Sequence, residues 1–441
     1  MTEPVRRAGV FALLCTLSLA VPLLGPEIAA ALAAVVLLGA VGITDGPIFD
    51  LLAYPDDYED GRLYGLVAFV LAGVALGLLA VQSSMTTAVF VGTVFLIGYG
   101  NFGERLVRTQ TDSDVAHAAG FCLIATVAAV VGQAATVGLT GGAIQSALPT
   151  ILFLAASGAL LAALLRDVML LYDDPVVMLS VGLLLWLLAE LDPVLGATEI
   201  SIALAITAAL GYASYALETA SIAGMLTGVL LGLLTIVLGG YGWFVVLISF
   251  FAIGGLSTKF RYDRKEDLGV AEDNNGARGT GNVLGNAAVG LVAVLGYAAS
   301  EAAFLPIDSE LFLFAFAGSV ATAMSDTLSS EIGSVFEQPR LITTLEPVDP
   351  GTDGGVTWQG EVAGVVGATI VAVISYALFP EVDAVGAAII VAAGFVGMTV
   401  DSLLGATLEG PLLGNQGVNF LATLSGAIVC ALLGLSFAIL G

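Results

Sequence analysis

Long apolar runs alternate with short polar segments along almost the whole chain. Most of these runs approach the roughly 20 residues that an α-helix needs to cross a bilayer. Backbone amides in hydrocarbon must be paired within their own segment, so each run is predicted to be a helix. The pattern therefore predicts an all-α, polytopic transmembrane helical bundle. Its spans, about 15 in number, fall near residues 9–25, 27–44, 63–81, 85–100, 116–138, 147–165, 175–191, 197–213, 220–239, 242–257, 282–304, 310–325, 358–379, 384–400 and 418–440.

The positions of the basic residues predict the orientation of this bundle. Lys and Arg are concentrated in the cytoplasmic loops of membrane proteins. With Arg6 and Arg7 placed in the cytoplasm, alternation across the predicted spans brings all 12 basic residues to that side. We therefore predict a multi-pass protein of the cell (plasma) membrane, with a cytoplasmic N-terminus and an external C-terminus.

Composition excludes a soluble domain and adds an expectation about salt. The mean hydropathy is +1.01, and 58% of the residues are hydrophobic against 11% charged. A net charge of −25 with only two lysines, Lys259 and Lys265, is typical of proteins solvated in very high salt, so we expect a halophilic protein. The three cysteines, Cys15, Cys122 and Cys430, lie in apolar runs without metal-like spacing and are predicted to be inert thiols.

Polar motifs are distributed unevenly, which predicts two domains. Residues 1–205 form an N-terminal transmembrane bundle of unknown role, whose candidates are limited to Asn-Phe-Gly-Glu-Arg at 101–105 and the group of Asp112, Asp114 and His117. His117 is the sole histidine, so a histidine-based metal site has no support and a packed or interfacial side chain is favoured. Residues 206–441 contain the dense motifs and form the second predicted domain.

Residues 259–286 form a polar stretch between apolar runs. They contain five of the 12 basic residues, balanced by five acids. Glycines in the second half of the stretch let backbone N–H groups approach an anion, and Arg278 offers a fork for phosphate. Asn282 and Asn286 are four residues apart and share one helix face. A helix cap with an arginine that anchors lipid headgroups fits the same residues, and both interpretations stay open at this point.

Three carboxylates lie at predicted helix ends on the same membrane face. Asp326 and Glu331 belong to residues 317–333, and Asp401 belongs to a weakly similar segment, 393–410, which suggests two helix ends that face each other. A carboxylate at the membrane edge is costly unless it pairs or binds a cation, so all three are candidate catalytic residues and metal ligands. Oxygen-only ligands of this kind suit Mg²⁺. Snorkelling helix ends in an acidic protein are the alternative.

Two further segments complete the predicted polar face. The loop 336–357 contains prolines and glycines that prevent a helix, while its apolar residues favour order. The same loop contains Arg340 and the paired threonines Thr343 and Thr344, which offer hydroxyl donors. The segment 414–419 enters the last span from the same face and offers Asn415 and Asn419 for positioning.

Several blocks in the second half of the chain resemble an integral-membrane family that includes the plant phytyl-phosphate kinases, with archaeal relatives proposed to act on geranylgeranyl phosphate. The resemblance covers about 214–441 and leaves the role of residues 1–205 open. The blocks, in order, are STKF, LGVAEDNNGARGTGNVLGN, ATAMSDTLSSEIG, PRLITTLEPVDPGTDGGVTWQGEVAG, DSLLGATLEG and VNFLATLSGA.

This resemblance implies an integral-membrane enzyme that transfers a phosphoryl group from CTP or ATP to a prenyl monophosphate at the cytoplasmic face, giving the diphosphate. A nucleoside triphosphate, an isoprenoid lipid phosphate and membrane lipid would be its partners, with Mg²⁺ as cofactor and no role for nucleic acid. We assign catalytic and metal-binding roles to Asp326, Glu331 and Asp401. Phosphate-binding roles are assigned to Lys259, Arg278, Asn282, Asn286, Arg340, Asn415 and Asn419.

Two other functions fit the same sequence. A nucleotidyltransferase that forms a CDP-lipid would bind the same two ligands as the kinase. A transporter of a polar lipid or anion would use the two similar segments as a repeat, although the polar residues gather at one membrane face and not at the midplane.

Overall fold

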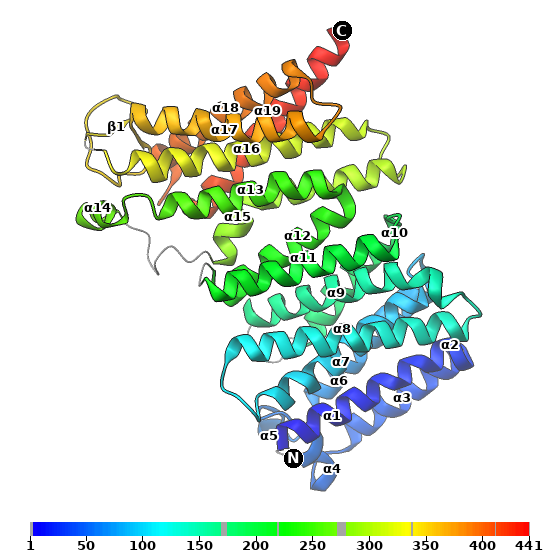
Figure 1. Cartoon of the computed structure of the whole chain (residues 1–441). Helices are drawn as coiled ribbons and strands as arrows, with labels where there is room; N and C mark the ends of the chain where they lie inside the picture. Colours follow the sequence, from blue (N-terminus) through cyan, green and yellow to red (C-terminus); the bar gives the residue numbers. More distant parts are fainter. Residues whose placement is uncertain are drawn as a thin grey trace. The chain divides into compact units, whose positions relative to one another are not determined.

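The computed structural model describes residues 3–168, 174–217, 220–270, 279–336, 338–410 and 412–440. Contacts between Cα atoms divide the chain into two compact units, Met1–Ile206 (unit 1) and Thr207–Gly441 (unit 2). Both units are built almost entirely of helices, which are drawn in sequence colours in Figure 1. The predicted all-α, polytopic bundle is thereby confirmed.

Among the described residues, twelve helices are long and apolar enough to cross a membrane, and a bent pair, Pro26–Gly42 with Gly46–Leu52, would add one more. Two predicted spans are helices that do not reach this standard. Residues Thr87–Val107 carry Asn101, Glu104 and Arg105 in their second half, and Asp174–Glu190 is only 17 residues long. The predicted number of about 15 thus counts helices that are more polar or shorter than a regular span.

Unit 1 contains short as well as spanning helices, and its last helix continues into unit 2. The elements are α1 (Glu3–Cys15), η1 (Thr16–Leu19), α2 (Ala20–Leu24), α3 (Pro26–Gly42), α4 (Gly46–Leu52), α5 (Asp57–Asp60), α6 (Tyr64–Gln82), α7 (Thr87–Val107), α8 (Asp114–Leu139), α9 (Ile144–Val168), α10 (Asp174–Glu190) and α11 (Ala197–Ala216).

Unit 2 alternates long helices with a short hairpin. Its elements are α12 (Ile222–Gly239), α13 (Tyr241–Thr258), α14 (Tyr262–Asp267), α15 (Thr280–Glu301), α16 (Ser309–Gly333), β1 (Arg340–Leu341), β2 (Gly355–Val356), α17 (Trp358–Leu378), α18 (Ala384–Leu408) and α19 (Asn415–Leu440). Side-chain caps define several of the helix starts: Asp308 accepts from the Glu310 N–H, Thr357 from Gly360 and Asp383 from Gly386.

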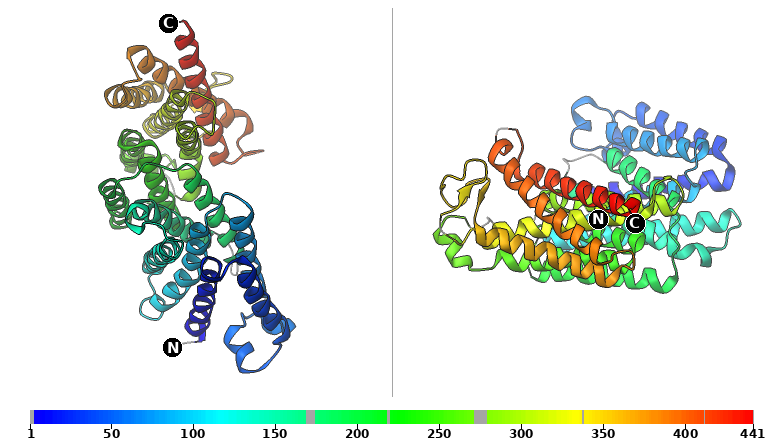
Figure 2. Two further views of the ribbon diagram at one scale, coloured as in Figure 1. Left: turned by 90° about the vertical axis from the view of Figure 1, so that its right-hand side faces the viewer. Right: turned by 90° about the horizontal axis from the view of Figure 1, so that it is seen from above.

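Helix α16 is the central element of unit 2, packed by α15, α17, α18 and α19 (Figures 1 and 2). Small residues allow this close approach, as is usual where lipid supplies no hydrophobic driving force between helices. A Cβ added at Gly367 of α17 would lie 2.8 Å from the Met324 carbonyl oxygen, and one at Gly394 of α18 would lie 3.1 Å from the Ala321 carbonyl oxygen. The Ser325 hydroxyl donates a 2.7 Å hydrogen bond to the Gly364 carbonyl. These contacts fix where the end of α16 lies relative to α17 and α18.

Candidate functional site

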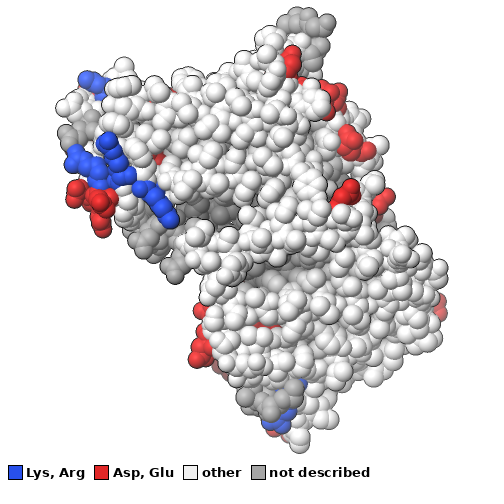
Figure 3. Space-filling view, viewed as in Figure 1, with Lys and Arg blue, Asp and Glu red and all other residues white. Residues whose placement is uncertain are grey.

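The direction of the helices in unit 2 brings the predicted motifs to one end. Helices α13, α16 and α18 finish at this end, while α15, α17 and α19 begin there. We call it the motif end. In Figure 3, Lys and Arg gather on this end of unit 2, around α14 and β1. All described basic residues of unit 2 belong to it: Lys259, Arg261, Arg264, Lys265 and Arg340.

Two carboxylates from different helices meet at the motif end. The side chains of Asp326 on α16 and Asp401 on α18 hydrogen-bond to each other. Two carboxylates this close repel unless a proton or a cation lies between them. The Oδ2 atom of Asp401 is buried and has no hydrogen-bond partner among the described residues. The pair therefore offers an oxygen-rich position with unused acceptor capacity.

A third carboxylate, Glu409, extends this pair. Its charge acts on both Asp326 and Asp401, and its side chain hydrogen-bonds with Asn415 at the start of α19. Burial, followed by the negative charge of Asp353, raises the pKa of Glu409, while the hydrogen bond with Asn415 lowers it. We call Asp326, Asp401 and Glu409 the acidic cluster.

Asparagines continue the network from the acidic cluster along α19. The Asn419 side-chain N–H donates a 3.0 Å hydrogen bond to Oδ1 of Asn415, which thus lies between Glu409 and Asn419. The structure brings together the predicted residues Asp326, Asp401, Asn415 and Asn419. Glu409 was not among the predicted site residues, although it closes the same motif as Asp401 eight residues later.

Glu331, the other predicted metal ligand, has a different partner. Its carboxylate forms an ion pair with Nζ of Lys265, whose side chain is only 2% exposed. The ammonium also donates to the carbonyl oxygens of Ser257 at 3.2 Å and Thr258 at 3.1 Å. These carbonyls end α13, where the helix dipole favours a cation. Lys265, which was not among the predicted site residues, therefore joins α13, α14 and α16.

The predicted set of three metal ligands does not form one group in the structure. Within the described ranges there is no group of three or more His, Cys, Asp or Glu side chains close enough to hold a metal ion. Asp326 and Asp401 lie together, whereas Glu331 is engaged by Lys265. The pair of carboxylates Asp326 and Asp401 still suits Mg²⁺, which prefers oxygen ligands and takes part of its coordination from water and substrate phosphates.

The residues predicted to hold phosphates are distributed around the motif end. Lys259 is exposed at the end of α13. Arg340 is exposed in β1 and donates a 2.6 Å hydrogen bond to the Leu345 carbonyl. Arg278 lies outside the described residues.

The start of α15 packs tightly on the start of α19. A Cβ added at Gly281 would lie 2.4 Å from Cδ of Gln416, and one at Gly285 would lie 3.0 Å from the Gln416 carbonyl oxygen, so the two helix ends are in close contact. Asn282 and Asn286 belong to this part of α15. The Asn286 side chain donates to the Asn282 carbonyl at 3.0 Å and is held against its own helix.

The segment between α16 and α17 folds over α18. Arg340–Leu341 pairs antiparallel with Gly355–Val356, and the segment projects beyond the helix ends in Figure 2. Gly354 has a φ of +73°, and a Cβ there would lie 2.6 Å from the Ser402 carbonyl oxygen. This close approach, together with the electrostatic effect of Asp353 on Glu409, makes the segment a cover for one side of the acidic cluster.

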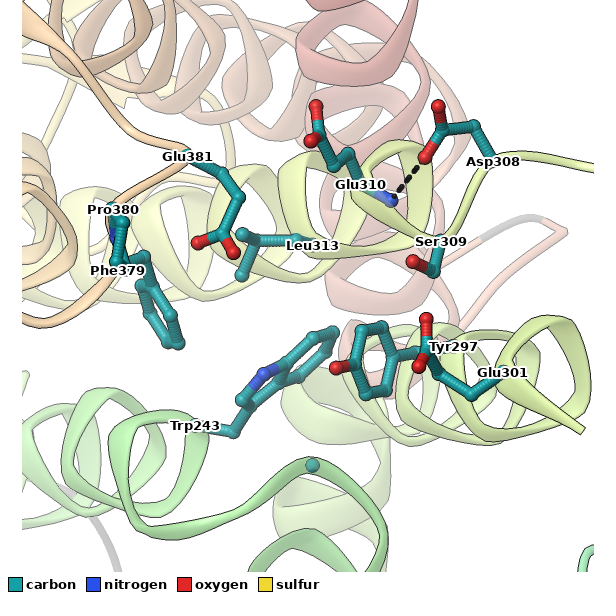
Figure 4. Close-up of a pocket in the computed structure, with 11 residues that line it drawn as sticks. Trp243, Tyr297, Glu301, Asp308, Ser309, Glu310, Leu313, Phe379, Pro380 and Glu381 are labelled. Atoms are coloured by element: carbon teal, nitrogen blue, oxygen red, sulfur yellow. Dashed lines mark hydrogen bonds between the residues drawn. The ribbon is translucent and has the colours of Figure 1, made fainter.

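A separate cavity lies at the opposite end of unit 2. Its volume is about 390 Å³, and its lining combines Trp243 and Tyr297 with four carboxylates (Figure 4). These acids are Glu301, Asp308, Glu310 and Glu381. Among the described residues that line the cavity there is no Lys or Arg, so its charge disfavours phosphate. Phosphate chemistry is better placed at the motif end.

Fold and polar residues define a polytopic helical membrane protein with a carboxylate-rich site at one end of its second unit. The family model described as integral membrane protein DUF92 matches residues 205–427. The chain therefore belongs to this family, and the predicted membership of an integral-membrane family is confirmed.

Individual relatives agree with this assignment. The uncharacterized membrane protein MJ0933 of Methanocaldococcus jannaschii is 34% identical over 212 residues, 48% of this chain and 84% of that protein. The uncharacterized membrane protein sll0875 of Synechocystis sp. is 33% identical over 200 residues, 44% of this chain and 75% of that protein. Protein VTE6, chloroplastic, of Arabidopsis thaliana is 34% identical over 220 residues, 48% of this chain and 65% of that protein. No solved structure matches the chain.

Proposed function

We propose that the chain is an integral-membrane kinase that transfers the γ-phosphoryl group of CTP or ATP to a prenyl monophosphate, such as phytyl or geranylgeranyl phosphate. The observation that supports this most directly is the Asp326–Asp401 pair, which lies at the same end of unit 2 as its described basic residues. Two kinds of group then lie at the edge of an apolar bundle. The basic side chains suit phosphates, and the carboxylates suit a divalent cation. A lipid phosphate would keep its chain among the helices and its phosphate at this end.

The reaction needs positioning more than a strong base. An oxygen of the prenyl phosphate attacks the γ-phosphorus, the bond from the γ-phosphorus to the bridging oxygen breaks, and the nucleoside diphosphate leaves with that electron pair. Because the attacking phosphate is already ionised, no side chain has to remove a proton. The exposed cations Lys259 and Arg340 would contact phosphate oxygens, as would Arg278, and the asparagines would orient them.

Asp326 and Asp401 would hold Mg²⁺, and the charge of Glu409 would act on both of them. When bound, this ion neutralises charge on the transferred phosphoryl group and orients the phosphates. Glu331 would act on the site through Lys265 and the end of α16. In this proposal Glu331 is no longer a metal ligand, whereas Asp326 and Asp401 remain the proposed metal ligands.

Location in the cell belongs to the same proposal. The basic residues of unit 2 gather at the motif end, and the end with the acidic cavity has none among the described residues. By the positive-inside rule the motif end would face the cytoplasm of the plasma membrane, where nucleoside triphosphates are available.

Purified protein with labelled nucleotide and geranylgeranyl phosphate tests the activity. Label from the γ-phosphate should appear in the prenyl product. Transfer of the α-phosphate instead would show the nucleotidyltransferase that forms a CDP-lipid. Absence of both labels from the lipid, in protein that remains folded, would reject enzymatic transfer and favour a transporter.

A further inference from the structure

A second, partly buried polar cluster lies in unit 1, where the proposed function uses no residue. It is formed by the ends of α7 and α9 and the start of α10, whose labels are shown in Figure 1. We call it the α7 cluster. Its members are Asn101, Glu104, Arg105, Arg108, Arg166 and Asp174.

Every oxygen of the two carboxylates in the α7 cluster already has a partner. Glu104 binds Arg108 through Oε1 at 2.8 Å and Arg166 through Oε2 at 2.9 Å. Asp174 binds Arg166 through Oδ1 at 2.6 Å and Asn101 through Oδ2 at 2.8 Å. The acids are therefore satisfied, and the cluster has no acceptor free on them for a cation.

Two groups of the cluster are left without a partner. The Oδ1 atom of Asn101 is buried and accepts no hydrogen bond within the described residues. Arg105 lies within electrostatic range of Glu104, yet it forms no hydrogen bond or ion pair with any described residue. A buried acceptor without a donor is costly, and so is a half-buried cation without an anion.

The net charge of the cluster identifies the class of ligand. Three arginines face two carboxylates, which leaves one positive charge in a protein whose total is −25. A ligand that satisfies both open groups needs an anionic oxygen for Arg105 and an O–H donor for Asn101. A singly protonated phosphate monoester has both. An ionised carboxylate or a sulfate has no O–H to donate.

The position of the cluster indicates that this phosphate belongs to a lipid. Helix α9 is long and apolar enough to span a membrane, and Arg166 lies in its last turn. A phosphate at that depth lies at the boundary between hydrocarbon and water, where a lipid headgroup is found.

We propose that the α7 cluster binds the phosphate monoester headgroup of a membrane lipid, with Arg105 and Asn101 as the contacting residues. Asp174 positions Asn101, and Arg166 holds Asp174 beside Glu104. The inference rests on the proposed kinase function only in the choice of a prenyl phosphate as probe. Unit 1 would thereby hold lipid of the same chemical class as the substrate of unit 2.

Binding to the full-length protein in detergent, without nucleotide, tests this proposal. Calorimetry with geranylgeranyl phosphate is compared for wild type, Arg105→Gln and Asn101→Leu. Arg62→Gln is the matched control, because it removes the same charge from an exposed arginine of unit 1 that contacts the Val41 carbonyl. We expect each cluster variant to weaken the unit 1 site at least tenfold and Arg62→Gln to leave it unchanged.

Stoichiometry separates this proposal from the proposed function. If both hold, wild type binds two lipids per chain and Arg105→Gln binds one. If only the unit 1 site exists, wild type binds one and Arg105→Gln binds none. Unchanged binding in both cluster variants would overturn the proposal. The cluster would then serve only to link the helices through ion pairs.

Two further probes identify the recognised group. Inorganic phosphate should bind much more weakly than geranylgeranyl phosphate, and geranylgeraniol should not compete with it. Equal affinity for inorganic phosphate would overturn the assignment to a lipid, and equal affinity for the alcohol would overturn the role of the phosphate.

Discussion

At the scale of single residues, the proposed function of unit 2 depends on which carboxylates are free to bind a cation. Asp326 and Asp401 face each other, and Glu331 is neutralised by Lys265. These partners give carboxylates of the same sequence motif different roles. Substitution of Asp326 should therefore lower turnover, whereas disruption of the Lys265–Glu331 ion pair should lower stability.

Replacement of Asp326 by Asn removes charge from the acidic cluster while keeping its size. We expect turnover to fall by about 10²- to 10³-fold, the usual loss when one electrostatic contact to the reacting group is removed. Thermal unfolding should change little, because the like charge of Asp401 is also relieved. Steady-state kinetics and a melting curve in detergent measure both quantities.

The control for Asp326→Asn is Glu381→Gln, which makes the same chemical change in the acidic cavity at the other end of unit 2. It should retain full activity. Wild-type turnover in Asp326→Asn would remove this residue from the site.

Replacement of Lys265 by Met leaves Glu331 as an uncompensated, largely buried charge. Breaking one side of a buried ion pair costs about 3–5 kcal/mol, so a lower melting temperature is expected. The double variant with Glu331→Gln should recover part of the loss. Lys259→Met serves as control because this lysine is exposed. A single variant as stable as wild type would show that the ion pair contributes nothing to folding.

At the scale of elements, the contact of segment 338–357 with α18 sets the position of this segment over the acidic cluster. A Cβ at Gly354 would lie 2.5 Å from Cβ of Ala406 and 2.7 Å from the Ala406 amide nitrogen. The segment is held at a distance that glycine alone permits. Its position over the acidic cluster is therefore sensitive to one methyl group.

Gly354→Ala should displace the segment and lower activity, while helix content stays unchanged by circular dichroism. Gly410→Ala is the matched control, because Gly410 has a φ of +84° with nothing within 4 Å of the added Cβ. Both substitutions carry the cost of a left-handed residue, about 1–2 kcal/mol. Only Gly354→Ala adds the collision with α18. Equal activity in the two variants would show that the contact is dispensable.

At the scale of the molecule, orientation in the membrane determines which ligands reach each end of unit 2. Thr343 is exposed beside the motif end, and Glu301 is exposed at the opposite end. A cysteine at Thr343 should react with an impermeant thiol reagent only from the cytoplasmic side. A cysteine at Glu301 should react only from outside, and the reverse pattern would overturn the proposed orientation.

Sequence periodicity was sufficient for the architecture of this protein. Runs of apolar residues long enough for a bilayer must form helices, because hydrocarbon offers no other partner for the backbone. Each predicted span is a helix in the structure. The positions of Asp326 and Asp401 at similar points of two similar segments also predicted helix ends that face each other.

Side-chain partners were decided by tertiary packing. Sequence spacing relates residues within one helix, whereas Lys265 meets Glu331 across 66 positions and Arg166 meets Glu104 across 62. No local pattern distinguishes the buried Lys265 from the exposed Lys259, or shows that Asn101 and Asp174 complete one cluster. Those contacts exist because glycine and other small residues bring particular helix faces together. The sequence by itself determined the helices and the end of unit 2 where the motifs gather, and packing in three dimensions decided which charges pair and which stay open to a ligand.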